Sequence, residues 1–259
     1  NLGFAYRLQR RYAEAEGVLQ EALESYQSSQ DLSGQAFAHT NLGLGHYAQA
    51  RWDQALHHHR SAHDLWSETG DQQGIAQALH NMGIAYIGLR DWPQAESALQ
   101  SAIKLYKKTH ARRDLAVASM DLGEAYRQQD RPEQAEVLYR QAIEVMEESQ
   151  HTRGLAMTYN NIGLACTQQE KWALAEDYLC RSIAYWRELG EPVWQANSED
   201  NLADAYLQQQ RWQEAMQMVD SAQAHLEGLG VTGQVEELLA DIDEHRQTAL
   251  SGLGRGAGL

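Results

Sequence analysis

Histidines concentrate in one stretch of this sequence, and imidazole both binds metals and titrates near neutral pH. The stretch contains His39, His46, His57, His58, His59 and His63. His59 and His63 are four residues apart, the helical spacing at which two imidazoles can reach one metal ion. However, no cysteine or carboxylate cluster accompanies them at a recognisable ligand spacing. A zinc site or a pH-sensitive core is therefore a hypothesis, while packed or solvated histidines and no cofactor are the prediction.

The two cysteines offer little further chemistry. A catalytic thiol needs a positioned base and an oxyanion site, and neither is recognisable around Cys166, which we expect to be a small buried thiol. Gly43 and Gly45 do not form a phosphate loop, because no strand precedes them and no Gly-Lys-Ser follows. The chain is predicted not to be an enzyme. A metal-dependent or hydrolytic activity in the histidine-rich stretch is the remote alternative.

Amide side chains recur at a fixed interval, which suggests recognition rather than catalysis. The column reads Asn1, Asn41, Asn81, Asp121, Asn161 and Asn201, with a step of forty residues each time. An asparagine amide offers two donors and one acceptor, which can pair with a peptide backbone whatever its side chains. Alternatively, these amides bond to neighbouring helices and organise the array. Both interpretations stay open, and Asp121 replaces the amide by a charge.

The forty-residue step is a property of the whole chain and predicts its fold. One further column reads Ala15, Ala55, Ala95, Ala135, Ala175 and Ala215. Apolar spacing within the second unit predicts two helices, roughly 34–49 and 52–68. Pro93, Pro132 and Pro192 fall where helices would start, and Gly70, Gly190 and Gly230 follow the ends of second helices. We therefore expect an all-α solenoid of stacked antiparallel helix pairs.

These columns also predict the boundaries. We expect a repeat array over 1–231, with a truncated first repeat and further repeats stepping at 41, 81, 121, 161 and 201. Residues 232–250 read as an amphipathic capping helix, and the glycine-rich tail 251–259 as disordered. Because the first helix lacks its opening turns, we expect a fragment of a longer protein, with an apolar N-terminal edge that could pair with another copy.

The repeated residues resemble the signature of the tetratricopeptide repeat family. The third unit shows it as Met82, Gly83, Tyr86, Ala95, Leu99 and Ala102. The forty-residue unit is similar to the longer variant in kinesin light chains, in the polarity adaptor LGN, and in bacterial signalling ATPases and maltose-activator-type regulators. The linker 70–76 resembles the bacterial group most. The resemblance implies a right-handed superhelix whose first helices line a concave groove.

By this resemblance, the amide column and its neighbours face the groove. In the kinesin light chain and LGN relatives, and in peptide pheromone receptors, asparagines at this register are associated with a bound peptide. The expected partner-binding residues are Asn41, Asn81, Asp121, Asn161, Asn201, Asn160, His80, Glu124, Asp200, Asp204, Phe37 and Leu44. His80, Asn160 and Asp200 stand where the lysines of the family's carboxylate clamp would be, so chaperone-tail binding is disfavoured.

We expect one part of this groove to be acidic and another part to be apolar. Glu199, Asp200 and Asp204 lie close to Asn201 in sequence, and such carboxylates would attract a basic segment of the partner. Phe37 and Leu44 are apolar and could anchor a hydrophobic side chain. The net charge of −15 argues against nucleic-acid partners, and no apolar run approaches the roughly 20 residues of a membrane span.

The predicted function is a non-catalytic, cytoplasmic protein- or peptide-binding module. We expect it to be the sensor or scaffold part of a larger bacterial signalling or regulatory protein. The alternative is a small-molecule-sensing domain of a transcription regulator, with its ligand lodged among groove residues. An extended ligand bound along the asparagines would favour a peptide. A closed pocket with convergent polar groups would favour a metabolite.

Overall fold

The computed structural model describes residues 2–229 and 233–256, and these residues form thirteen α-helices. The first helices of the repeats are α1 (Leu2–Leu8), α3 (Leu32–Tyr47), α5 (Gln72–Gly88), α7 (Arg112–Gln128), α9 (Thr152–Gln168) and α11 (Pro192–Gln208). The second helices are α2 (Tyr12–Ser28), α4 (Trp52–Thr69), α6 (Trp92–Lys108), α8 (Pro132–Glu148), α10 (Trp172–Leu189) and α12 (Trp212–Leu226). A last helix, α13 (Gly233–Gly256), follows. The predicted all-α repeat array is confirmed.

Left-handed residues close the helices at each turn. Gly70 and Gly190 have φ of 76° and 68° and end α4 and α10, as predicted. Gly230, the third predicted closing glycine, lies outside the described residues. Most other turns place a non-glycine residue at this conformation, for example Ala50 with φ of 55°. Pro93, Pro132 and Pro192 lie in the first turns of α6, α8 and α11, where the missing N–H costs no helical bond.

Small residues allow the two helices of a repeat to approach closely. A Cβ on Gly83 would lie 2.5 Å from Cγ of Leu99, and a Cβ on Gly163 would lie 2.6 Å from Cγ of Leu179. The alanine column is fully buried from Ala55 onward. In these repeats a side chain of the second helix, Leu99 or Leu179, therefore fills the space that the glycine of the first helix leaves empty.

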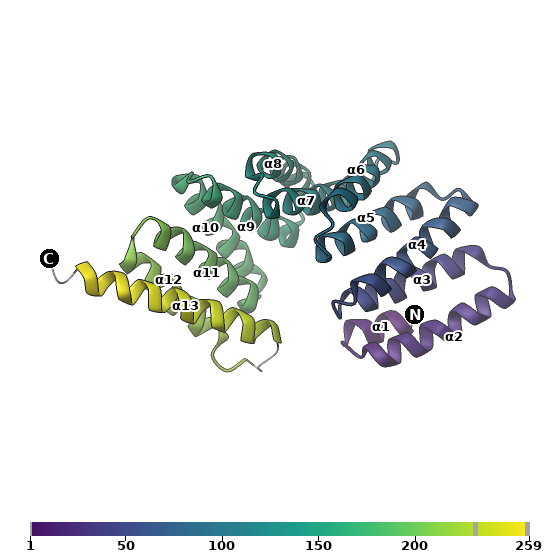
Figure 1. The fold of residues 1–259 in the computed structure, drawn as a ribbon, viewed down its shortest axis with the longest axis horizontal. Coiled ribbons are helices and arrows are strands. Elements are labelled where there is room, and N and C mark those ends of the chain that lie inside the picture. Colours follow the sequence, from purple (N-terminus) through teal and green to yellow (C-terminus); the bar gives the residue numbers. More distant parts are fainter. Residues whose placement is uncertain (1, 230–232, 257–259) are drawn as a thin grey trace. The chain divides into compact units, whose positions relative to one another are not determined.

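The chain divides into two compact units, Asn1–Ala125 and Tyr126–Leu259, hereafter unit 1 and unit 2. Within each unit a second helix packs on its own first helix and on the first helix of the next repeat, as α4 does on α3 and α5 (Figure 1). Consecutive first helices of one unit also contact each other, as in α3–α5 and α9–α11, whereas no two second helices of the same unit do among the described helices. First helices therefore form the more closely packed layer of each unit.

The last helix ends the array but differs from the expected cap. It packs on α11 and α12 through Val235, Leu238 and Ile242, which are buried. Helix α13 continues to Gly256, so residues 251–256 are helical where a disordered tail was expected. The reason is packing: a Cβ on Gly252 would lie 2.3 Å from the Trp212 ring, so this glycine is a contact residue. Residues 257–259 lie outside the described part.

Candidate functional site

The exposed side of the first-helix layer is the surface on which a partner was expected. We call it the first-helix face, and it consists of the positions equivalent to Phe37, Thr40, Asn41 and Leu44 in each first helix.

In unit 1 the amide column turns inward. Asn41 is 4% exposed and its Nδ2 donates to the Phe37 carbonyl at 2.9 Å within the same helix. Asn81 is 6% exposed, and its Nδ2 has no hydrogen-bond partner among the described residues. The closeness of neighbouring first helices covers these positions. They therefore leave little of an amide ladder for a visiting peptide.

A polar pair joins two first helices of unit 1. His80 Nε2 on α5 lies 2.6 Å from Asp121 Oδ2 on α7. The His80 side chain is 14% exposed and that of Asp121 is 34% exposed, so the pair lies at the edge of the face. Glu124, one turn further along α7, is half-buried. Asp121 therefore combines two predicted roles: it lies on the face, and it bonds to the neighbouring helix.

The same register is used again in unit 2. Asn201 Nδ2 on α11 donates to Asn160 Oδ1 on α9 at 2.9 Å, across the same separation of 41 residues. Asn197 Oδ1 lies 3.4 Å from the same nitrogen. Asn161 is half-buried and has no hydrogen-bond partner among the described residues. In the amide column of this unit, Asn201 therefore organises the helices, whereas Asn161 retains its hydrogen-bonding capacity.

The three carboxylates predicted to form an acidic group, Glu199, Asp200 and Asp204, do not lie together on this face. Asp200 is 4% exposed and bonds to His245 Nδ1 of α13 at 2.7 Å. Burial raises the pKa of Asp200, and the hydrogen bond to Asp200 raises the pKa of His245. Glu199 is buried and lies 3.4 Å from His225 of α12. Asp204 remains half-exposed, with Gln208 donating to it at 2.8 Å.

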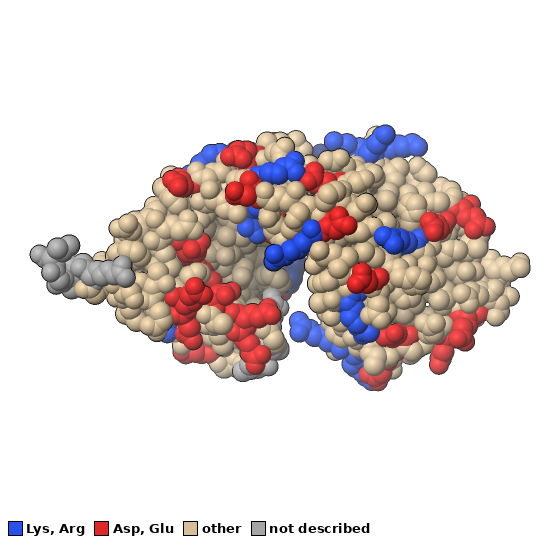
Figure 2. Space-filling model, in the orientation of Figure 1, with Lys and Arg blue, Asp and Glu red and all other residues tan. Residues whose placement is uncertain are grey.

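Carboxylates of the last helix add to this charge. Asp204 and Asp241 both act electrostatically on the Asp200–His245 pair, which places α11 and α13 carboxylates near each other. In Figure 2 acidic side chains gather over the part of unit 2 formed by α11 and α13. The negative region is therefore present in unit 2, but it is built from both helices rather than from α11 alone.

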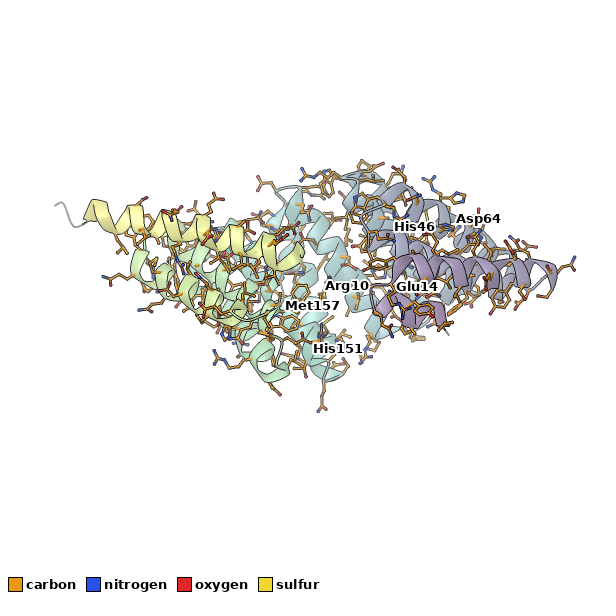
Figure 3. All side chains as sticks on the ribbon, turned by 90° about the horizontal axis from the view of Figure 1, so that it is seen from below. Arg10, Glu14, His46, Asp64, His151 and Met157 are labelled. Atoms are coloured by element: carbon orange, nitrogen blue, oxygen red, sulfur yellow. The ribbon has the colours of Figure 1, made fainter. Side chains whose placement is uncertain are left out.

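Exposed apolar side chains lie on the first-helix face of both units. Phe37 is 42% exposed in unit 1, and Leu44 beside it is half-buried. Met157 on α9 is 41% exposed (Figure 3). The sequence interpretation missed Met157, although it stands at the Phe37 position three repeats later. Register alone could have found it.

The histidines form a cluster between α3 and α4. His39 Nδ1 lies 3.0 Å from His58 Nδ1, and the His46 ring of α3 stacks on the His58 ring with centroids 5.2 Å apart. His59 is fully buried beneath Gly43, with no hydrogen bond to either ring nitrogen. His63 instead lies 3.1 Å from Asp64. The described residues contain no group of three or more ligands that could hold a metal ion.

Two histidines of this cluster have pKa values far below the ordinary value for imidazole. Burial lowers the pKa of His58 to about 4 and that of His59 to about 3. Neighbouring imidazoles add to both shifts. Both rings are therefore neutral at physiological pH. Cys166 is buried as predicted, and burial raises the pKa of its thiol to about 11.

Comparison with known proteins agrees with this architecture. A family model described as tetratricopeptide repeat matches residues 1–68, 34–108, 74–148 and 154–227. No curated protein matches the chain. No helix among the described residues has both the length and the apolar character needed to cross a membrane.

Several solved structures share the fold at low sequence identity. BtubC (BKLC) from P. vanneervenii is 17% identical with a TM-score of 0.73, over 85% of this chain and 94% of that one. The apo form of RapI is 11% identical with a TM-score of 0.71, over 99% of this chain and 97% of that one. A Rap protein complexed with Competence and Sporulation Factor is 12% identical with a TM-score of 0.69, over 96% and 74%. At these identities the likeness concerns the fold.

Proposed function

Because this chain belongs to the tetratricopeptide repeat family, we propose that it is a non-catalytic module whose first-helix face binds a segment of a partner protein. The observation that carries the proposal is that Asn161 and Met157, four residues apart, lie on the same face of α9. Asn161 has no hydrogen-bond partner among the described residues, and Met157 is 41% exposed. An amide can hold the backbone of an extended segment, while the methionine accommodates an apolar side chain.

The site proposed here is narrower than the sequence suggested. Asn41 and Asn81 are buried, so they act within the protein. In unit 2 the amides of Asn161 and Asn197 are half-exposed. We therefore assign peptide contact to unit 2 first, and in unit 1 to Phe37 and its half-buried neighbour Leu44.

The partner segment is proposed to carry a basic residue. Asp204 lies on the same helix as Asn201, and the α13 carboxylates add to its field. Opposite charge in the ligand would increase the association rate, and the effect would weaken with salt. A similar fold occurs in the Rap protein solved with Competence and Sporulation Factor, which supports placing the module in a bacterial signalling or regulatory protein.

At Asn41 a peptide is favoured over an enclosed metabolite. The cavity beside Asn41, lined also by Tyr12, Leu42 and His46, has a volume of about 10 Å³. That is room for about one water molecule.

Self-association through α1 also stays a proposal, motivated by Leu2 and Phe4, which are 54% and 43% exposed.

The proposal can be tested with a displayed library of random twelve-residue peptides. Selected peptides should be enriched in lysine or arginine, and their affinity can be measured by fluorescence anisotropy. We expect Asn161→Ala and Met157→Ala each to weaken binding about 10-fold, because a loss of about 1.4 kcal/mol corresponds to that factor.

The control is Glu144→Gln, an exposed position on α8 away from this face. It should leave the affinity unchanged. Equal binding by wild type and both face variants would remove the first-helix face of α9 from the proposal. Failure to select any peptide with salt-sensitive affinity would remove the basic partner.

A further inference from the structure

A second surface of unit 2 has the composition of a cation-binding site. It is a cleft of about 390 Å³ between the end of α8 and the side of α10, with α9 at its base. Its lining residues are Glu147, Tyr159, Arg181, Ala184, Tyr185 and Glu188. Four of these six residues belong to the second helix α10. The cleft is therefore distinct from the first-helix face.

Tyrosine rings form a stack at this cleft. Tyr178 and Tyr159 have ring centroids 6.0 Å apart, and Tyr159 and Tyr185 have centroids 5.7 Å apart with rings 5° from parallel. Tyr159 is buried and its hydroxyl donates to Glu147 Oε1 at 2.9 Å. Tyr185, at the end of the stack, is half-buried. The rings are therefore held in place before any ligand arrives.

Guanidinium groups already lie over two of the three rings. Arg140 is 6.0 Å from the centroid of Tyr178, and Arg181 is 5.7 Å from that of Tyr159. Aromatic faces attract such cations through the ring quadrupole. Among the described residues no cation lies over Tyr185. The stack thus repeats one tyrosine–arginine arrangement twice and leaves its third ring without a cation.

The electrostatic balance of the cleft is negative. Glu147 and Glu188 line it, and both are exposed. Arg181 is paired with Asp177 Oδ2 at 3.0 Å, so its charge is compensated locally. Glu188 has no hydrogen-bond or ion-pair partner in the described part of the chain. A carboxylate beside an aromatic face is the combination that holds a guanidinium or ammonium group.

The cleft is not a consequence of the repeat pattern. One repeat earlier, the positions of Glu147, Tyr159 and Tyr185 hold Lys107, Ser119 and Val145. Packing of helix pairs therefore requires neither the acids nor the rings. Their joint occurrence at one place indicates a local role.

We propose that this cleft binds the side chain of an arginine on a partner protein, with the guanidinium stacked on Tyr185 and ion-paired with Glu188. Arginine is preferred to lysine because its planar group can stack on the ring and pair with a carboxylate at the same time. The site goes beyond the proposed peptide face, because five of its six lining residues belong to α8 and α10 and it shares only α9, through Tyr159. It gives the module a second point of contact for a basic partner.

The test uses Nα-acetyl-arginine amide as the probe and Nα-acetyl-citrulline amide as its neutral counterpart. Tyrosine ring resonances of the labelled full chain would be followed by NMR during titration. We expect saturable shifts of Tyr185 with the arginine probe, with Kd on the order of 1–10 mM for a single group, and no saturable shift with citrulline.

Two variants test the residues, and one controls for charge. Glu188→Gln should weaken the arginine probe at least about 3-fold, since it removes the ion pair. Tyr185→Leu, which places at 185 the residue found at Leu65 and Leu105, should weaken it by a similar factor, followed through Tyr159. Glu68→Gln carries the same charge change at the equivalent, exposed position of α4 in unit 1 and should have no effect. Equal shifts with citrulline, or an unchanged Kd in Glu188→Gln, would overturn the proposal.

Discussion

His59 stands in a column that otherwise holds apolar or aromatic side chains. The equivalent residues are Leu19, Leu99, Tyr139, Leu179 and Val219. The His59 ring is fully buried and neither of its nitrogens has a hydrogen bond. A buried polar group without a partner costs about 1–3 kcal/mol. The second repeat therefore carries a polar group at a position where packing alone favours leucine.

Replacing this ring should stabilise the protein. We expect His59→Leu to raise the free energy of unfolding by about 1–3 kcal/mol at pH 7, measured by urea denaturation. Leu99 occupies the same position against Gly83 in the next repeat, so the leucine fits. A lower stability of the variant would mean that the ring has a partner of its own.

The same residue predicts an acid-sensitive stability. Because burial lowers the pKa of His59 from 6.5 to about 3, the unfolded chain takes up a proton below pH 6.5 while the folded chain does not. Stability is then complete above pH 6.5 and is lost as the pH falls from there toward about 3. Denaturation at pH 7 and pH 5 should show a smaller loss in His59→Leu than in wild type. Equal losses would contradict this assignment.

At the scale of the helix, Gly43 and Gly45 of α3 lie two residues apart but in different surroundings. A Cβ on Gly43 would lie 2.4 Å from the His59 ring, whereas a Cβ on Gly45 would meet nothing within 4 Å. Gly43→Ala should therefore destabilise unit 1 by about 1–3 kcal/mol through overpacking. Gly45→Ala should stabilise it by about 0.5–1 kcal/mol, because alanine restricts the unfolded chain. Thermal unfolding of both variants gives the comparison, and effects of the same sign would refute it.

The Asp200–His245 pair holds α13 against α11. Its hydrogen bond raises the pKa of His245 above 6.5. The resulting stabilisation is fully present below pH 6.5 and is lost as the pH rises through the folded-state pKa. Amide exchange in α13, corrected for its intrinsic pH dependence, should therefore show weaker protection at pH 8.5 than at pH 6. His245→Gln should remove this difference between the two pH values; its persistence would locate the titration elsewhere.

Helix pairs follow from the sequence more directly than the candidate site does. The forty-residue period and the positions of Pro93, Pro132 and Gly70 predict helix ends within about two residues, because these are local backbone preferences. Burial within one column depends on the neighbouring repeat instead. Asn41 is buried whereas Asn161 is half-exposed, although both occupy one register. His245 lies outside the repeat pattern, so no column could reveal its contact with Asp200.

At the scale of the whole molecule, stability should be distributed along the array rather than shared by one core. Within each unit, the described helices contact only helices one or two places away in the chain. In such arrays stability is approximately a sum over repeats and their nearest-neighbour interfaces. A local disturbance is then expected to remain local.

Gly163 of unit 2 provides the test, because its contact with Leu179 is equivalent to that of Gly83 with Leu99. We expect Gly163→Ala to lower amide protection in α9 and α10 by about 1–3 kcal/mol, since the new methyl group displaces Leu179. Protection in α3 and α4 of unit 1 should change by less than about 0.5 kcal/mol. Hydrogen exchange followed by mass spectrometry resolves the two regions. An equal loss in both would show that the units unfold as a single cooperative body, and the stability of each repeat could then not be assigned to its own contacts.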